Sequence, residues 1–143
     1  MAKLHKGEIS INGIIIHPTD DLTAVLKKTC RITKIIRNIN NFQYVFFEDI
    51  DFFELHGHIR IIFSPVGKME SISFGHRNNY EYSEKDMAQY VSFLIKHNIK
   101  SGYSYKWGSI SAIGRNMHSN TPSIAIRLKD RESTNSFHFP WRK

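Results

Sequence analysis

The stretch His58–Phe74, HIRIIFSPVGKMESISF, decides the fold. Apolar residues recur at every second position on both sides of its centre; they are Ile59, Ile61, Phe63, Ile72 and Phe74. A period of two is typical of a strand with one buried face. The central Ser64-Pro65-Val66-Gly67 favours a turn, because proline presets its φ angle and glycine tolerates a positive one. The stretch therefore predicts an antiparallel β-hairpin.

Aromatic segments precede this hairpin. Phe42–Phe47 and Ile50–Leu55 are rich in residues that favour strands, and we expect two strands there, with Gly57 separating the second from the hairpin. Nearer the start, Glu8–Ile16 predicts a first strand with a bend or bulge at Asn12-Gly13.

The sequence predicts one helix on each side of the hairpin. After Pro18, the acids Asp20 and Asp21 suit a helix N-terminus, and we expect a short helix from Leu22 to about Thr29. The second helix is expected to start after Ser83 and to end near Asn98; its apolar face would be formed by Met87, Tyr90, Val91 and Leu94. Two further strands are expected at Tyr103–Ile113 and Ser123–Leu128, joined by the polar Gly114–Pro122.

Short turns between neighbouring strands favour antiparallel pairing. We therefore expect an α+β fold: a mainly antiparallel sheet of about six to seven strands with two helices packed on one side of it. The chain shows no repeat or linker, so residues 1–143 should form a single domain.

Composition narrows the class of protein. Hydrophobic residues make up 41% of the 143 residues, enough for a core, so disorder is not expected. The single cysteine, Cys30, cannot form an internal disulfide, and no apolar stretch approaches the length of a membrane span or of a signal-peptide core. The cytoplasm is the expected location.

The formal net charge is +7, and the charges are unevenly spread. Lys27–Arg37 contains only basic charges, whereas Glu48–Glu54, which we call the acidic segment, contains only acidic ones. Two interpretations of the acidic segment stand: a strand pair with one solvated face, or an exposed aromatic and acidic patch that binds a basic partner. Under the second interpretation the partner-binding residues are Glu48, Asp49, Asp51, Phe52, Phe53 and Glu54.

Several histidines and basic residues have side chains that could bind a metal or take part in catalysis. His56 and His58 would lie on the same face of a strand, with His76 as a third ligand, but two or three scattered histidines do not specify a metal site. A nuclease would need a base, an acid and a cation, for which His56, His58, His118, Lys106 and Arg115 have suitable chemistry but no fixed geometry. We therefore predict a non-enzymatic protein that needs no metal or cofactor.

Aromatic and basic residues are interleaved at Tyr103–Trp107 and in Phe137–Lys143. This pattern is typical of proteins that bind single-stranded nucleic acid by base stacking and phosphate pairing. Alternation along a half-buried strand produces the same pattern, and we favour the strand at Tyr103–Trp107. Any nucleic-acid binding is expected to be weak and sensitive to salt.

The hairpin, together with Ile11-Asn12-Gly13-Ile14, Trp107-Gly108-Ser109-Ile110 and Ser123–Leu128, resembles the small immunity proteins of bacterial toxin–immunity pairs, including contact-dependent growth inhibition systems. The resemblance implies a compact cytoplasmic protein that binds and neutralises a cognate toxin. The basic net charge departs from many such inhibitors, which present acidic surfaces, so here only the acidic segment would fill that role. The alternatives are a nucleic-acid-binding module that uses the basic C-terminal half, or a small nuclease.

Overall fold

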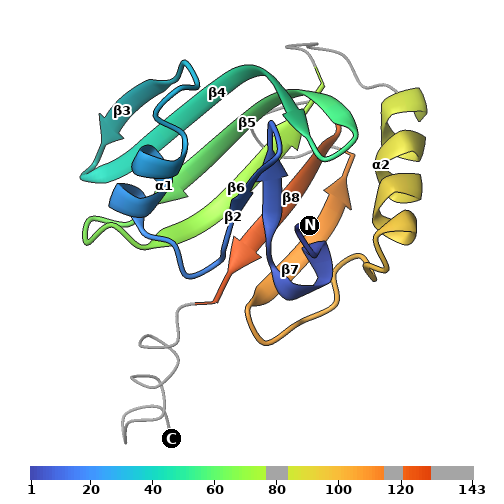
Figure 1. Cartoon of the computed structure of the whole chain (residues 1–143). Coiled ribbons are helices and arrows are strands. Elements are labelled where there is room, and N and C mark those ends of the chain that lie inside the picture. Colours follow the sequence, from blue (N-terminus) through green and yellow to red (C-terminus); the bar gives the residue numbers. More distant parts are fainter. Residues whose placement is uncertain (77–83, 115–120, 130–143) are drawn as a thin grey trace, which may run out of the picture.

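The computed structural model describes residues 1–76, 84–114 and 121–129. In chain order the elements are η1 (Leu4–Lys6), β1 (Ile9–Ile11), β2 (Ile14–Ile16), α1 (Leu22–Lys28), β3 (Ile35–Ile39), β4 (Phe42–Phe52), β5 (Leu55–Phe63), β6 (Met69–Gly75), α2 (Glu84–Lys96), β7 (Gly108–Ile113) and β8 (Ser123–Leu128). Figure 1 shows a strongly curled sheet, with α1 and the β1–β2 hairpin in front of it and α2 beside β7.

The described strands form one sheet in the order β2-β1-β4-β5-β6-β8-β7, and β3 pairs with β4 outside this path. Every pairing is antiparallel. The predicted α+β class with a mainly antiparallel sheet is confirmed; the described part contains eight strands, where six to seven were expected. The predicted hairpin is β5–β6, in which Ile61 lies opposite Ile72.

The helices form where the sequence predicts them. Asp21 caps α1, since its Oδ1 accepts the N–H of Ala24 at 2.8 Å. The buried face of α2 consists of Tyr90, Phe93 and Leu94. Val91 was expected on this face but is 41% exposed. Phe93 takes its place, and its ring lies 5.7 Å from that of Phe52 in β4.

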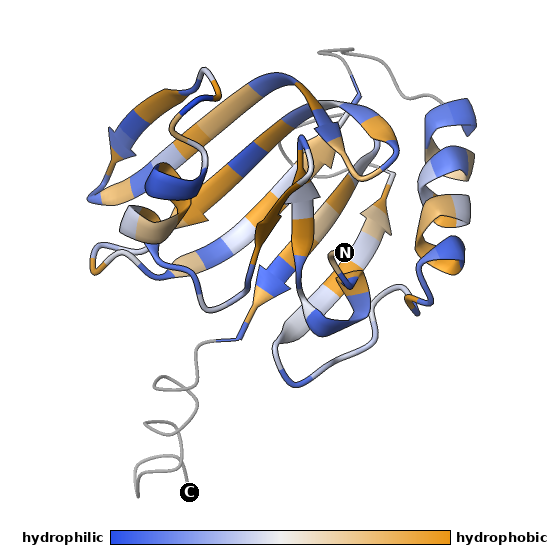
Figure 2. Ribbon diagram, viewed as in Figure 1, coloured by the Kyte–Doolittle hydropathy of each residue, from blue (hydrophilic) through white to orange (hydrophobic). Residues whose placement is uncertain are grey.

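One face of the sheet is covered and holds the core. The inward side chains of β4 to β8 meet Ile9, Ile11 and Ile16 of the β1–β2 hairpin, Val25 of α1 and the buried face of α2 in a single cluster. The strand residues between the inward ones are partly or fully exposed, as the BeBiBeBiB burial pattern of β5 shows. Figure 2 displays the resulting alternation of hydropathy along the strands.

Three of the expected strand boundaries are wrong. Glu8–Ile16 is not one bent strand, because Asn12 and Gly13 have positive φ angles of 51° and 83° and turn the chain into a hairpin. Phe42–Phe47 and Ile50–Leu55 are not separate strands: β4 continues to Phe52 through a bulge between Phe47 and Ile50. The strand expected from Tyr103 begins only at Gly108.

Two more features differ from the expectation. The strand β3 was not predicted; it pairs with β4 through a turn at Asn40-Asn41, both with positive φ. Gly57 does not separate two strands but lies inside β5. A Cβ atom at that position would collide with the carbonyl oxygen of Gly75 in β6, so the close approach of these strands requires glycine there.

Candidate functional site

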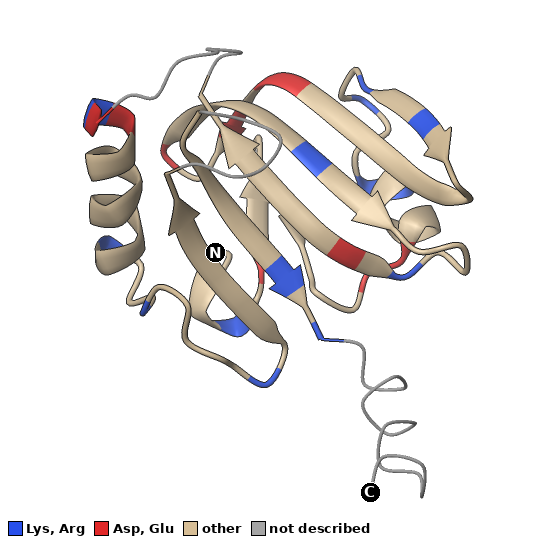
Figure 3. Cartoon of the chain, turned by 180° about the vertical axis from the view of Figure 1, so that it is seen from behind, with Lys and Arg blue, Asp and Glu red and all other residues tan. Residues whose placement is uncertain are grey.

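The side of the sheet opposite the core is not covered by any described helix, and we call it the uncovered face (Figure 3). The strand registers place its residues in two rows. One row runs Arg37, Tyr44, Ile62, Ser71, Arg127 and Ser109. The other runs Ile35, Phe46, Arg60, Ser73, Ala125 and Ser111. The first row contains two arginines and the second contains one, each among aromatic or aliphatic side chains.

The aromatic part of the uncovered face lies on β4. Tyr44 and Phe46 project to the same side, and their rings are stacked with centroids 6.3 Å apart. Beside them, Ile35 and Ile39 of β3 are 49% and 43% exposed. Large apolar side chains are thus left in contact with solvent at one edge of the sheet.

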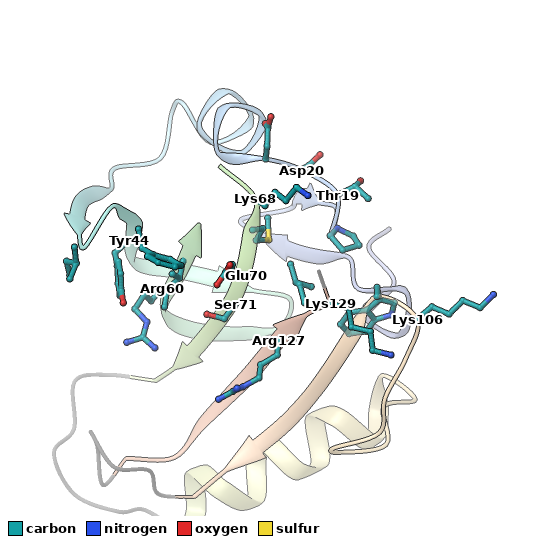
Figure 4. Close-up of a pocket in the computed structure, with 18 of the residues that line it drawn as sticks. Thr19, Asp20, Tyr44, Arg60, Lys68, Glu70, Ser71, Lys106, Arg127 and Lys129 are labelled. Carbon is teal, nitrogen blue, oxygen red and sulfur yellow. The ribbon is translucent and has the colours of Figure 1, made fainter. Parts of the chain in front are cut away.

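Part of the uncovered face is hollowed into a cavity of about 1200 Å³, which we call the basic hollow (Figure 4). Its basic side chains are Lys6, Arg60, Lys68, Lys106, Arg127 and Lys129. Its acidic side chains are Asp20, Asp21 and Glu70. Figure 4 shows Arg60 and Arg127 extending from the sheet and Lys106 projecting at the other end of the hollow.

Two of the three acids in the basic hollow already have partners within the chain. Asp20 accepts the N–H of His17 and forms an ion pair with Lys28 at 2.6 Å, while Asp21 caps α1. Glu70 is exposed at the irregularity where β6 shifts its register against β5. The hollow contains six basic side chains and three acids, and two of these acids already have partners within the chain. The excess of positive charge attracts negatively charged groups.

The acidic segment lies at the end of β4, and its six predicted contact residues fall into different environments. Glu48 and Asp49 are exposed at the bulge, and the side chain of Asp51 is 64% exposed. Phe52 is completely buried in the core, so it is not available to a partner. Phe53 is half-buried, with its ring 5.8 Å from that of Phe93.

The acids of this segment pair mainly with nearby histidines. The His56 ring lies between two carboxylates, with Nδ1 2.7 Å from Asp51 and Nε2 2.6 Å from Asp49. These two bonds raise the pKa of His56. Glu54 pairs with Lys96, the last residue of α2, at 3.3 Å and with His97 just after it at 2.9 Å. Burial raises the pKa of Glu54, but these contacts outweigh it and lower that pKa. The ion pairs of these acids therefore run to His56, to Lys96 at the end of α2 and to His97 just after it.

His58, two residues from His56, has a different environment. Its ring packs over Gly75, and burial lowers the pKa of His58. His76, the third histidine considered as a metal ligand, stacks on Tyr90 with ring centroids 4.9 Å apart. Within residues 1–76, 84–114 and 121–129, no group of three or more metal-ligating side chains comes together.

The residues considered for a nuclease are not gathered. His56 and His58 lie on β5, whereas Lys106 lies before β7 at the rim of the basic hollow, and β6 and β8 separate them. His118 and Arg115 lie outside the described residues, as does the aromatic and basic tail Phe137–Lys143.

The interleaved segment Tyr103–Trp107 forms a loop whose rings contact one another. Tyr105 and Trp107 are stacked at 5.4 Å, and Tyr103 meets the Tyr105 ring edge-on at 4.8 Å. The Trp107 indole N–H donates to the His5 carbonyl at 2.9 Å. These rings stabilise the loop against the N-terminal segment, which explains their spacing without a stacked base.

Sequence reasoning missed the uncovered face as a unit. The alternation of His58, Arg60 and Ile62 along β5 signals one outward face. Arg60 and Arg127 lie on the same face because of the register in which β5 and β8 pair with β6. The local sequence does not predict that register.

No described helix is long and apolar enough to cross a membrane. A search of protein-family models, of curated proteins and of solved structures found no match to this chain.

Proposed function

We propose that this chain is a non-enzymatic binding protein that neutralises a partner protein in the cytoplasm, as an immunity protein does with a cognate bacterial toxin. The observation that carries the proposal is the uncovered face, on which arginines lie among half-buried aromatic and exposed aliphatic side chains. Arginine and aromatic residues are enriched in protein–protein interfaces and supply most of their binding energy.

The charge pattern of this face supports a protein partner. Arg37, Arg60 and Arg127 occupy its rows, while Glu70 brings acidic charge to the basic hollow on the same face. A partner protein can match such a mixed pattern with its own mixed charges, which gives both orientation and rapid association. Neutralisation would follow from covering the partner's active or binding surface.

Nucleic-acid binding is the second candidate, favoured by one observation: Lys106, Arg127 and Lys129 of the C-terminal half all line the basic hollow. Glu70 in the same hollow opposes it, because a carboxylate repels a phosphate backbone. The engaged rings of Tyr105 and Trp107 also do not offer the free stacking platform typical of such proteins.

The first experiment is co-expression with the protein encoded by the adjacent gene, followed by growth measurement and calorimetry of the purified pair. We expect restored growth and a complex. Arg60→Glu combined with Arg127→Glu should weaken the complex by roughly tenfold or more without changing the melting temperature. Lys27→Glu with Lys85→Glu is the matched control, since it makes the same change in net charge away from the uncovered face.

The outcomes distinguish the two candidates. If the control pair weakens the complex as much as the arginine pair, net charge alone acts and the uncovered face is not the contact surface. Tight binding of a single-stranded oligonucleotide at physiological salt, with dependence on its sequence, would favour nucleic acid instead.

The acidic segment is proposed as the acidic end of the same contact surface, now without Phe52. Asp49→Lys with Asp51→Lys should slow association with a basic toxin and leave the melting temperature nearly unchanged, because both side chains are exposed. A large loss of stability with unchanged binding would show that these acids serve only to hold His56.

A further inference from the structure

The strand β3 forms an edge of the sheet, and its side chains are unusually exposed to solvent. Among the described strands it pairs only with β4, and all five of its residues are exposed. Three of the five are isoleucines: Ile35, Ile36 and Ile39 are 49%, 47% and 43% exposed. An edge strand presents a row of backbone N–H and C=O groups to solvent, and apolar side chains on such an edge favour pairing with another chain.

The hairpin geometry identifies the backbone groups that point outward. Ile39 and Phe42 flank the two-residue turn Asn40-Asn41 and form the first pair of the ladder. Antiparallel pairs alternate between hydrogen-bonded and non-hydrogen-bonded, so Ile39 and Arg37 bond to β4. The backbone groups of Ile36 and Asn38 then face away from β4, where an added strand would meet them.

The side chains of β3 determine which segment of a partner can pair with this edge. Ile35, Arg37 and Ile39 share the uncovered face. A second copy paired antiparallel along all of β3 would be centred on Arg37 and would place two arginines directly opposite each other, which is destabilising. A segment with an acidic residue opposite Arg37 and aliphatic residues two positions to either side would instead match both the charge and the isoleucines.

We infer that the partner donates an extended segment that adds to β3 as a further strand and places a carboxylate against Arg37. This inference rests on the proposed function, because it describes how a partner protein engages the same face. Backbone bonds along Ile36 and Asn38 supply affinity, and the side chains opposite Ile35, Arg37 and Ile39 supply specificity. The added strand extends the aromatic edge at Tyr44 and Phe46 and continues the uncovered face into the partner.

A synthetic peptide tests the inference without the natural partner. The probe has nine residues, a central glutamate, valine two positions to either side, and threonine or serine elsewhere, so that it reads the same in both directions. Its twin carries lysine at the centre. Fluorescence anisotropy should show that the glutamate peptide binds roughly fivefold more tightly than the lysine peptide, since an attractive cross-strand pair replaces a repulsive one. NMR should show the largest amide shifts at Ile36 and Asn38.

Three variants test the backbone and the charge separately. Ile36→Pro removes an outward N–H without touching the bonds to β4, and proline is tolerated at such an edge position, so peptide binding should be lost while the fold remains. Ile36→Thr keeps the N–H and the branched shape and should keep most of the binding. Arg37→Glu should reverse the preference between the two peptides, and it addresses the charge pairing even if the proline variant does not fold.

Several results would overturn the inference. They are no binding of the glutamate peptide at roughly millimolar concentration, an unchanged preference in Arg37→Glu, and amide shifts confined to β7 and β8. Self-association that Ile36→Pro abolishes would show that a second copy occupies the edge. If Ile36→Pro leaves toxin binding intact while Arg60→Glu with Arg127→Glu removes it, strand addition is wrong and the proposed function stands. Peptide binding without any toxin binding would mean that β3 accepts an added strand but that the proposed toxin-neutralising function is wrong.

Discussion

The β1–β2 hairpin and the strand β3, which forms a hairpin with β4, pair with the same edge of β4 and end in opposite environments. The β1–β2 hairpin turns at Asn12-Gly13 and meets β4 at Phe52, whereas β3 turns at Asn40-Asn41 and meets β4 from Phe42 to Phe46. Both are rich in isoleucine. Those of β1 are completely buried, while every residue of β3 is exposed.

The difference lies in what covers each hairpin. The β1–β2 hairpin folds over the core face, where Leu4 of η1 and Val25 of α1 complete its burial. The isoleucines of β3 do not pack against the core cluster, and all five residues of the strand are exposed. Apolar residues in one hairpin therefore stabilise the fold, while in the other they remain available for binding.

The largest effect expected from this comparison concerns stability. Ile11→Ala removes a completely buried side chain from β1 and should lower the free energy of unfolding by about 2–5 kcal/mol. Ile36→Ala on β3 should change it by no more than about 0.5 kcal/mol, because that side chain already contacts solvent. Urea denaturation of both variants measures the contrast, and equal losses would mean that β3 belongs to the core.

Substitutions in the turns of the two hairpins should also differ in their effect on stability, but by less. Gly13 has a φ of 83° and no atom within 4 Å of an added Cβ, so Gly13→Ala should cost only the backbone strain, about 1 kcal/mol. Asn41 has a φ of 71°, which asparagine tolerates, so Asn41→Gly should shift stability by less than about 0.5 kcal/mol. Thermal melts of both variants provide the measurement. A cost at Gly13 far above this range would reveal a steric contact as well as strain.

The same hairpins show which parts of the fold could be predicted from the sequence and which could not. The β5–β6 hairpin and the position of α2 depend on local periodicity and were predicted from it, although the buried face of α2 contains Phe93 where Val91 was expected. Asn12-Gly13 is a strong hairpin signal, but the strands around it have only three residues each, too few to display a period. In β3 the adjacent Ile35 and Ile36 hide the alternation, and Asn40-Asn41 is a weaker turn signal than Asn-Gly.

The candidate site was harder to predict for a different reason. The bulge at Glu48 and Asp49, where Asp49 has a φ of 56°, interrupts the alternation of β4, so one long strand has the pattern of two short ones. The acidic segment was visible in the sequence, but the burial of Phe52 and the pairing of Asp49 with His56 depend on the packing around that bulge. Likewise, the rows of the uncovered face are set by register across six strands, which no local pattern encodes.

Two histidines on β5 differ in exposure and burial in the same way as the two hairpins. Two exposed carboxylates, those of Asp51 and Asp49, raise the pKa of His56, whereas burial beside Gly75 lowers the pKa of His58. An NMR titration should therefore find His56 above and His58 below the ordinary value of about 6.5. Asp49→Asn with Asp51→Asn should bring the pKa of His56 back toward that value and leave His58 unchanged.

The two shifts act on stability with opposite signs. Folded His56 holds its proton more tightly than the unfolded chain does, so its contribution is complete below about pH 6.5 and is lost as the pH rises through its raised pKa. Folded His58 holds its proton less tightly, so it favours folding above about pH 6.5 and loses that contribution as the pH falls through its lowered pKa. Because His56 is fully exposed and screened by solvent, removing its two carboxylates should alter its titration far more than the melting temperature. Coincident titrations of the two histidines would contradict the environments that the bulge and Gly75 provide.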